Sequence, residues 1–431
     1  GVPVRGTLEE IPDLCTRYNI HTIIVAIPTL KGNRLNHVID LCVSTHCAVQ
    51  MLSDPQLVGS GAPQQGAFRE LNPADFLSRD EVTLDMEKIS GYLTGKTVLV
   101  TGGGGSIGSE LCRQVMRFRP GKLLIFDIYE NCAYELLMEL QQKYGRDIPV
   151  TVLIGSIRDK KRLDEVFETY HPTVVFHAAA HKHVPLMEVS PAEAVKNNVL
   201  GTKNLLVSAS EHEVERFVQL STDKAVNPTS VMGCTKRICE MLIQTFAGNT
   251  DMKCVAVRFG NVLGSHGSVI PLFEAQIKKG GPVTLTDENI ERYFMTIPEA
   301  AQLVLQAGAL AESGNIYVLD MGEPVKIMDL AKQLIRFYGY EPGVNMEIKI
   351  VGLRPGEKLY EELMMDEEQD KMRRTQHNKI FVASPRTIDL AEFYEQLQAL
   401  EAAAAHNDEG VVKQLAAMIP TFTPTRENLK L

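Results

Sequence analysis

The stretch KTVLVTGGGGSIGSEL, which starts at Lys96, constrains the fold of this chain more than any other segment. An apolar run typical of a buried strand leads directly into consecutive glycines, and a helical pattern follows. Glycines between a strand and a helix let the backbone approach a pyrophosphate, whose charge then faces the N-terminus of the helix. The pattern predicts a nucleotide-binding turn with these cofactor contacts: Gly102, Gly105, Ser106, Ile107 and Gly108.

Similar apolar strand patterns recur downstream, and helical patterns separate them. They are KLLIFD (122–127), VTVLIG (150–155), TVVFHAAA (173–180), RFVQLS (216–221) and CVAVRFG (254–260). Repeated strand–helix units predict a parallel sheet with helices on both faces. We therefore expect an α/β chain with a Rossmann doubly wound parallel sheet, a smaller C-terminal substrate-binding lobe, and a partial α/β domain at the N-terminus.

The changes in pattern along the chain predict four parts. Residues 1–75 alternate helix and strand patterns without a glycine loop and end in a linker at 58–75, so we expect a partial α/β domain with no catalytic role. Residues 76–262 are expected to form the NAD-binding Rossmann domain. Residues 263–385 are expected to form the substrate-binding lobe, mixed with late Rossmann elements, and residues 386–431 a helical tail.

Charge and cysteine content exclude several classes of protein. The formal net charge of -10 argues against a nucleic-acid partner but is compatible with a local basic pocket for a phosphorylated ligand. The cysteines contain no CxxC pair and do not form the pattern of a disulfide framework. We therefore expect reduced, buried thiols, and we favour an inert thiol over a nucleophile for Cys234.

Asp127 ends the strand that follows the glycine loop, 19 residues beyond Gly108. A carboxylate at this place can accept hydrogen bonds from both adenosine ribose hydroxyls and would repel a 2′-phosphate, which favours NAD over NADP. Asp159 is expected to cap a helix, and Asn198 is a candidate for an amide that organises the backbone. The further cofactor-binding candidates are Ser156, Ile157, Ala178, Ala179 and Asn198.

A series of motifs carries a family resemblance. TGGGGSIGSE, FHAAAHKHVPLME, NNVLGT, STDKAVNPT, MGCTK, VRFGNVLGSHGSVIP, ERYFMTIPEA and RPGEKLYEEL occur in this order. Together they resemble the nucleotide-sugar 4,6-dehydratases of the extended short-chain dehydrogenase/reductase superfamily. They are most similar to the large bacterial UDP-N-acetylglucosamine 4,6-dehydratases of polysaccharide and glycoprotein assembly. The resemblance covers roughly residues 90–365 and, weakly, the N-terminal part.

The resemblance implies a bound NAD, a UDP-sugar substrate and a reaction with no net oxidation. Hydride leaves sugar carbon 4, water is lost from carbons 5 and 6, and hydride returns to carbon 6. Residues 1–60 resemble the end of a degenerate nucleotide-binding domain. The chain begins at Gly1 in mid-pattern, and the resemblance implies a homo-oligomer whose upstream region anchors it at the cytoplasmic face of the bacterial inner membrane.

Asp223 and Lys224 directly follow the strand RFVQLS, at the sheet edge where a ligand would lie. Alone, they would be an ordinary solvated dipeptide. Within the motif series, we expect Asp223 to be the general acid for the departing 6-hydroxyl and Lys224 to be the base for the carbon 5 proton. Thr222 is expected to hydrogen-bond the 4-hydroxyl of the sugar.

Lys236 stands where the superfamily has the lysine of its YxxxK motif, but Met232 replaces the tyrosine. A thioether cannot take over the proton transfer of a phenol. Lys236 is expected to hold the nicotinamide ribose, and Met232 either packs against the ligand or is a plain core residue. Methionine-bearing members of the family are associated with retention of configuration at carbon 5, so we predict retention.

The expected substrate contacts are polar residues that follow the strands or lie in the later motifs. They are Lys182, Arg258, Asn261, Arg292, Arg354 and Glu357. Arginine forks match phosphate geometry, whereas a single arginine is otherwise a surface salt bridge. His181 and His183 are expected to pack or to form hydrogen bonds, and no metal is proposed.

Two alternative functions stay open at this point. A UDP-hexose 4-epimerase would share the fold, NAD and a UDP-sugar, but it needs the tyrosine and has no use for the acid–base pair. A catalytically inactive NAD-binding scaffold would have lost the tyrosine together with its activity. Full turnover in both Asp223→Asn and Lys224→Met would argue against the dehydratase mechanism.

Overall fold

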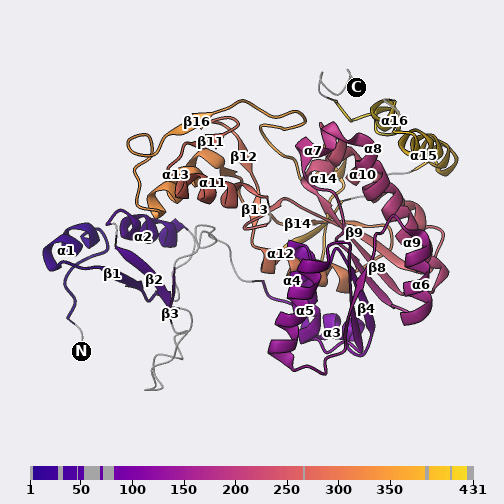
Figure 1. The fold of residues 1–431 in the computed structure, drawn as a ribbon, viewed down its shortest axis with the longest axis horizontal. Coiled ribbons are helices and arrows are strands. Elements are labelled where there is room, and N and C mark those ends of the chain that lie inside the picture. The colour runs from indigo at the N-terminus through magenta and orange to yellow at the C-terminus, as the bar shows by residue number, and fades with distance from the viewer. Residues whose placement is uncertain are drawn as a thin grey trace. The chain divides into compact units, whose positions relative to one another are not determined.

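A computed structural model of the chain describes residues 3–27, 33–45, 47–52, 68–70, 82–265, 267–383, 388–407 and 410–424 (Figure 1). The chain divides into two compact units. Unit 1 comprises Gly1–Glu81, Gly267–Thr296 and Pro324–Gly352. Unit 2 comprises Val82–His266, Ile297–Glu323 and Leu353–Leu431. None of the helices in the described ranges is long and apolar enough to cross a bilayer.

Unit 2 is built on a 9-stranded sheet in the order β17-β18-β14-β9-β8-β7-β4-β5-β6. The strands from β14 to β6 run parallel, and β18 and β17 are added antiparallel. Their bounds are β4 (Thr97–Thr101), β5 (Lys122–Asp127), β6 (Val150–Ile154), β7 (Val174–His177), β8 (Arg216–Thr222), β9 (Lys253–Phe259), β14 (Ile316–Leu319), β17 (Arg373–Arg374) and β18 (Ile380–Ala383). The Rossmann fold class is confirmed, and the predicted strands from β4 to β9 are all present.

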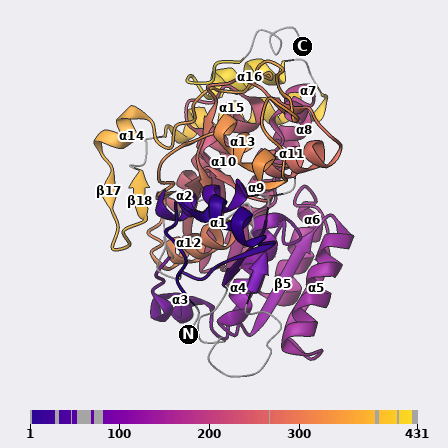
Figure 2. The same ribbon diagram turned by 90° about the vertical axis from the view of Figure 1, so that its left-hand side faces the viewer.

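Helices cover both faces of this sheet (Figures 1 and 2). On one face, α4 packs against α12, which also contacts α3. On the other face, apolar side chains of the strands share one core with α6, α9 and α10. The helices are α3 (Met86–Leu93), α4 (Ser106–Arg117), α5 (Glu130–Tyr144), α6 (Lys160–Tyr170), α7 (Val184–Val189), α8 (Pro191–Ala194), the π-helix η3 (Val195–Leu200), α9 (Gly201–Glu211), the 3₁₀ helix η4 (Asp223–Ala225), α10 (Val231–Ala247), α12 (Ile297–Ala309) and α14 (Asp366–Asp370).

Side-chain caps fix where two of these helices begin. Asp159 accepts a hydrogen bond from the Arg162 nitrogen at 3.0 Å, so the predicted cap of α6 is confirmed. Ser230 caps α10 by accepting from the Gly233 nitrogen at 3.1 Å. The second cap starts α10 directly after the segment STDKAVNPT, and this fixes the position of Lys236 relative to the end of β8.

The predicted lobe 263–385, which was expected to include late Rossmann elements, contributes residues to both units. Strand β14 pairs with β9, and β18 pairs with β14, so parts of the predicted lobe 263–385 extend the sheet of unit 2. Within this lobe, Gly267–Thr296 and Pro324–Gly352 belong to unit 1, and the other residues belong to unit 2. The predicted helical tail contains α15 (Leu390–Ala405) and α16 (Val411–Met418). Both helices contribute apolar side chains to the core that they share with α10, so the tail is part of unit 2.

Unit 1 contains the helix and strand patterns predicted near the N-terminus. Strand β1 pairs parallel with β2, and β3 pairs antiparallel with β2. The elements of unit 1 are α1 (Ile11–Tyr18), β1 (Thr22–Val25), α2 (Asn33–Val43), β2 (Ala48–Leu52), β3 (Phe68–Glu70), α11 (Val269–Lys278), β11 (Val283–Leu285), β12 (Glu291–Arg292), β13 (Phe294–Met295), β15 (Val325–Lys326), α13 (Ile327–Phe337) and β16 (Ile348–Ile350). Of the predicted linker 58–75, only β3 is described, and the remainder lies outside the described residues.

Candidate active site

The glycine loop forms the turn between β4 and α4. Gly102 has a φ of 65°, in the left-handed region that favours glycine. A Cβ at Gly102 would lie 2.6 Å from the Ala179 nitrogen, and a Cβ at Gly108 would overlap the Gly102 carbonyl oxygen. The N-cap of α4 is Gly105, so no side chain caps the first turn, where Ser106 and Ile107 are partly exposed. This turn fits a pyrophosphate, because its uncapped amides can bond phosphate oxygens.

Asp127 connects the glycine loop to the end of β5. Its Oδ2 accepts a hydrogen bond from the Gly104 nitrogen at 2.8 Å, and its Oδ1 accepts from the Tyr129 nitrogen at 2.9 Å. The side chain remains partly exposed, so it can also accept ribose hydroxyls. Ser156 accepts from the Arg158 nitrogen at 3.2 Å, whereas the Ile157 side chain is buried in the core. A cofactor contact of Ile157 would therefore come from its backbone.

Asn198 organises the loop that follows β7. Its Oδ1 accepts from the His181 nitrogen at 2.8 Å, and its Nδ2 donates to the His181 carbonyl and to Thr235 Oγ1, both at 3.0 Å. The buried side chain sits in η3, and π-helical turns are frequent at functional sites. Asn198 thus ties the loop with Ala178 and Ala179 to α10. A direct contact of Asn198 with a cofactor stays a prediction.

Thr222, Asp223 and Lys224 form a hydrogen-bonded group at the carboxyl end of β8. Thr222 Oγ1 donates to Asp223 Oδ1 at 2.8 Å, and Lys224 Nζ donates to the same oxygen at 3.0 Å. Asp223 is 0% exposed, and its Oδ2 has no hydrogen-bond partner among the residues that the structure describes. Because an unpartnered buried carboxylate oxygen is costly, we expect a ligand group to supply the missing partner.

Two more side chains contact the Lys224 ammonium. Asn261, in β10 (Asn261–Val262), accepts from Lys224 Nζ at 3.1 Å. Glu361 Oε1 lies 3.7 Å from the same nitrogen, and the Glu361 side chain is only 4% exposed. Asn261 was predicted as a sugar contact, and the structure places it beside the predicted base. Glu361 was not predicted as a site residue, although it belongs to the motif RPGEKLYEEL.

The segment with this motif is attached to the loop between β8 and α10. Thr229 Oγ1 donates to the Gly356 carbonyl at 3.0 Å, and Lys358 Nζ donates to the Val226 carbonyl at 3.1 Å. A Cβ on Gly356 would lie 2.8 Å from the Ser230 Cβ, so only glycine allows this approach. Two motifs that are more than a hundred residues apart in the sequence therefore form one site.

Lys236 reaches the end of β8 from the first half of α10. Its Nζ donates to the Leu220 carbonyl at 2.6 Å, and burial lowers the pKa of this lysine. Met232 is 4% exposed and belongs to the core shared with α6 and α9. This burial agrees with the plain core alternative for Met232, and a contact of Met232 with a ligand stays a prediction. Cys234 is fully buried, and burial raises the pKa of its thiol well above its ordinary value. Both observations agree with the expected inert thiol.

Arg258 is not placed to contact a substrate, so this prediction is wrong. Its guanidinium is 0% exposed and donates to Glu240, to Glu368 and to the Leu363 carbonyl. Burial raises the pKa of Glu240, but the guanidiniums of Arg258 and Arg237 outweigh this effect and lower it to about 2. Arg258 is thus part of a buried ion-pair network, because β9 directs this side chain into the protein beside α10 rather than to the sheet edge.

The remaining predicted substrate contacts are spread over both units. Lys182 is exposed, although nearby protein atoms partly desolvate its ammonium and lower its pKa. Arg354 is exposed, and its backbone nitrogen donates to Glu357 Oε2 at 3.2 Å. Arg292 belongs to unit 1, where its Nη1 donates to the Glu291 carbonyl at 2.7 Å. Their roles in substrate binding stay predictions.

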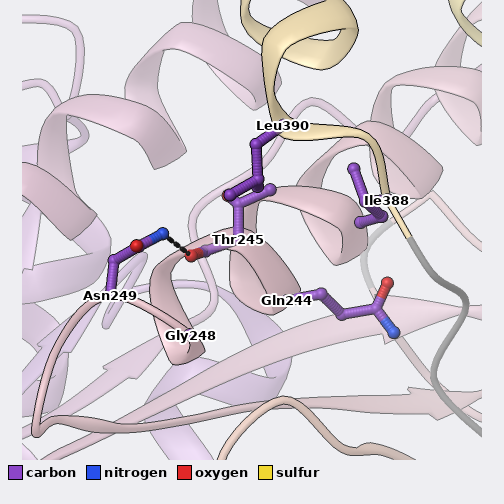
Figure 3. A pocket seen from close by; sticks show the side chains of 6 residues that line it. All are labelled: Gln244, Thr245, Gly248, Asn249, Ile388 and Leu390. Carbon is purple, nitrogen blue, oxygen red and sulfur yellow. Dashed lines mark hydrogen bonds between the residues drawn. The ribbon is translucent and has the colours of Figure 1, made fainter.

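A surface cavity of unit 2 lies at the far end of α10 from Lys236. Its lining residues are Gln244, Thr245, Gly248, Asn249, Ile388 and Leu390 (Figure 3). Asn249 is turned toward the backbone, where its Nδ2 donates to the Thr245 carbonyl at 2.7 Å. The cavity shares no lining residue with the group around Asp223, so we do not assign the chemistry to it.

Comparisons with known proteins give the family of this chain and several relatives. Residues 98–385 match a family described as polysaccharide biosynthesis protein. The chain is 53% identical over 364 residues to the capsular polysaccharide biosynthesis protein CapD of Staphylococcus aureus, covering 84% of this chain and 61% of CapD. It is 32% identical over 351 residues to a UDP-glucose 4-epimerase of Rickettsia canadensis, covering 78% of this chain and 98% of that protein. It is 33% identical over 271 residues to a UDP-N-acetylglucosamine 4,6-dehydratase (inverting) of Campylobacter jejuni, covering 62% of this chain and 76% of that protein.

Solved structures show the same fold. The X-ray structure of Pen from Bacillus thuringiensis is 34% identical, with a TM-score of 0.63, and the match covers 68% of this chain and 90% of Pen. The dTDP-glucose 4,6-dehydratase DesIV of Streptomyces venezuelae, solved with NAD bound, matches with a TM-score of 0.55 at 20% identity, covering 73% of this chain and 98% of DesIV. At that identity, DesIV supports the fold alone.

Proposed function

This chain belongs to the polysaccharide biosynthesis protein family, and from this premise we propose that it is a nucleotide-sugar 4,6-dehydratase. Its substrate in this proposal is UDP-N-acetylglucosamine, and its product is a UDP-4-keto-6-deoxy-N-acetylhexosamine for bacterial glycan synthesis. The chain spans 61% of the length of CapD, and the proposal concerns the residues of this chain. The full-length protein would act as a homo-oligomer at the cytoplasmic face of the inner membrane.

The cofactor in this proposal is NAD, which when bound would accept hydride from the sugar and return it. The uncapped first turn of α4 and the closely packed Gly102 would bind the pyrophosphate. Asp127 would accept the adenosine ribose hydroxyls, and it favours NAD because its charge repels a 2′-phosphate. Lys236, held at the Leu220 carbonyl, would hold the nicotinamide ribose.

The observation that carries the proposal is the hydrogen-bonded pair of the buried Asp223 and the partly buried Lys224 at the end of β8. Elimination needs an acid for the 6-hydroxyl and a base for the carbon 5 proton. One proton passed from Lys224 Nζ to Asp223, across 3.0 Å, yields a neutral amine and a neutral carboxylic acid. The amine can then take the carbon 5 proton while Asp223 protonates the departing hydroxyl. Asp223 Oδ2, which has no partner among the described residues, is the oxygen for this contact.

The epimerase is the second candidate, because a UDP-glucose 4-epimerase is 32% identical over most of this chain. An epimerase needs a base for the 4-hydroxyl, and at the position of the usual tyrosine this chain has the buried Met232. Thr222, in contact with Asp223, could pass the 4-hydroxyl proton to that carboxylate or to water. The pair formed by the buried Asp223 and the partly buried Lys224, for which an epimerase has no use, favours dehydration.

The test is incubation of the purified chain with UDP-N-acetylglucosamine and no added cofactor, followed by mass spectrometry of the sugar nucleotide. Loss of one water from each sugar would support the dehydratase with retained NAD. An unchanged mass with a new hexose in the NMR spectrum would support the epimerase. An unchanged sugar would contradict both and favour the inactive scaffold or a different sugar.

A further inference from the structure

Glu361 supplies a second buried carboxylate to the Lys224 ammonium. Its Oε1 lies 3.7 Å from Lys224 Nζ, and its side chain is 4% exposed. Two carboxylates of unit 2 that face Lys224 are therefore Asp223, from η4, and Glu361, from the segment before α14. Asn261, from β10, adds a neutral oxygen. Salt screens a contact of this kind much less than it screens a surface ion pair.

The backbone around Glu361 is held on both sides. Before it, Thr229 bonds the Gly356 carbonyl, and Lys358 bonds the Val226 carbonyl. After it, Arg258 Nη1 donates to the Leu363 carbonyl at 3.0 Å, and this arginine is itself fixed by Glu240 and Glu368. The buried ion-pair network therefore holds the backbone of Leu363, two positions after Glu361. This restrains the Glu361 carboxylate near Lys224.

We propose that Glu361 is a positioning residue that holds Lys224 at the end of β8 and stabilises the positive charge that returns to it during elimination. This inference rests on the proposed function. When the neutral Lys224 amine takes the carbon 5 proton, Asp223 is a neutral acid that is giving up its own proton. Glu361 is then a carboxylate that faces the developing ammonium at 3.7 Å, and a fixed charge of this kind lowers the barrier without reorganisation.

A test that does not depend on turnover is an NMR titration of the chain with ¹³C-methylated lysines, in which the Lys224 signal is identified by its loss in Lys224→Met. We expect Glu361→Gln to move the Lys224 titration to lower pH, because the protonated form loses an opposite charge. Glu361→Asp should restore part of this shift. The matched control is Glu362→Gln, because Glu362 is adjacent, its side chain is 48% exposed, and it pairs with Lys358 instead. A Lys224 titration that is the same in Glu361→Gln as in the unchanged chain would overturn the proposal.

The kinetic test uses the loss of water from UDP-N-acetylglucosamine. We expect Glu361→Gln to lower kcat by about 10- to 100-fold with KM nearly unchanged. The limb of the pH–rate profile that reports the base, Lys224, should move to lower pH. Glu362→Gln should change neither. An equal fall of kcat in both variants would indicate a merely structural role and contradict the proposal. If the unchanged chain released no water, the dehydratase assignment would fail, and the NMR titration would still decide whether Glu361 controls Lys224.

Discussion

The Arg258 guanidinium forms two hydrogen bonds with the Glu240 carboxylate, from Nε to Oε1 at 3.0 Å and from Nη2 to Oε2 at 2.8 Å, and both side chains are fully buried. Glu240 also accepts from Ser221 Oγ at 2.8 Å, one residue before Thr222. The network therefore lies directly behind the candidate acid–base group. It fixes the end of β8 from the interior of unit 2, and we expect a ligand to approach Asp223 and Lys224 from the solvent side.

Replacement of Glu240 should strongly destabilise unit 2. Glu240→Gln leaves two buried guanidiniums without their main counter-charge, so we expect a loss of about 3 to 5 kcal/mol in the free energy of unfolding. Chemical denaturation at neutral pH measures this loss. The control is Glu401→Gln, which breaks the exposed pair with Lys203 and should cost less than about 1 kcal/mol. Equal losses in both variants would contradict the structural role of the network.

The Glu240 carboxylate should also make the stability of unit 2 depend on pH in the acidic range. The pKa of Glu240 falls from 4.5 to about 2 on folding, so its contribution is complete above 4.5 and is lost as the pH falls toward 2. The difference in unfolding free energy between the unchanged chain and Glu240→Gln should shrink over this range. Denaturation curves at several pH values check this, and a constant difference would show that another group is responsible.

Gly102→Ala should reduce cofactor binding. The new Cβ would lie 2.6 Å from the Ala179 nitrogen in a residue with positive φ, so we expect a loss of about 1 to 3 kcal/mol in stability and little retained NAD. The measurements are Tm and the NAD released on denaturing the purified protein. The control is Gly91→Ala in α3, where nothing lies within 4 Å of the new Cβ. It should retain NAD, and its Tm should not fall, because alanine is the better helix former.

Asp223→Asn and Lys224→Met should each lower turnover by about 100- to 10,000-fold, since each removes one partner of the proton transfers. Both variants should retain NAD, because the glycine loop is unchanged. Asp159→Asn is a suitable control, since asparagine also caps helices well and the residue lies at the start of α6. Full turnover in both site variants would contradict the assigned mechanism.

The product should retain its configuration at carbon 5. Residue 232 is a buried methionine with no hydroxyl for proton transfer, as in the family members associated with retention. NMR of the product, recorded before the keto sugar equilibrates, gives the configuration from the coupling constants. A product with the opposite configuration would overturn this prediction.

The sequence alone determined the fold and the edge at which the chemistry is expected. Apolar runs of strand length and the glycines after β4 are local features, and they predicted the strands from β4 to β9, the turn at Gly102 and the cap at Asp159. Because parallel strands end at one edge, the position of Asp223 and Lys224 after β8 also placed them near the nucleotide loop. These inferences needed only neighbouring residues and the periodicity of the chain.

Tertiary structure decided which side chains meet, and local patterns carry no such information. Glu361 lies 3.7 Å from Lys224 in a segment that is held by the packing of Gly356 on Ser230 and by the bond from Arg258 to the Leu363 carbonyl. Arg258 was assigned to the substrate because it is a cation near a strand end, but Glu240 and Glu368, from distant parts of the sequence, make it a buried partner. The partners of a charged side chain depend on long-range packing, whereas the existence of its strand depends on residues that are adjacent in the chain.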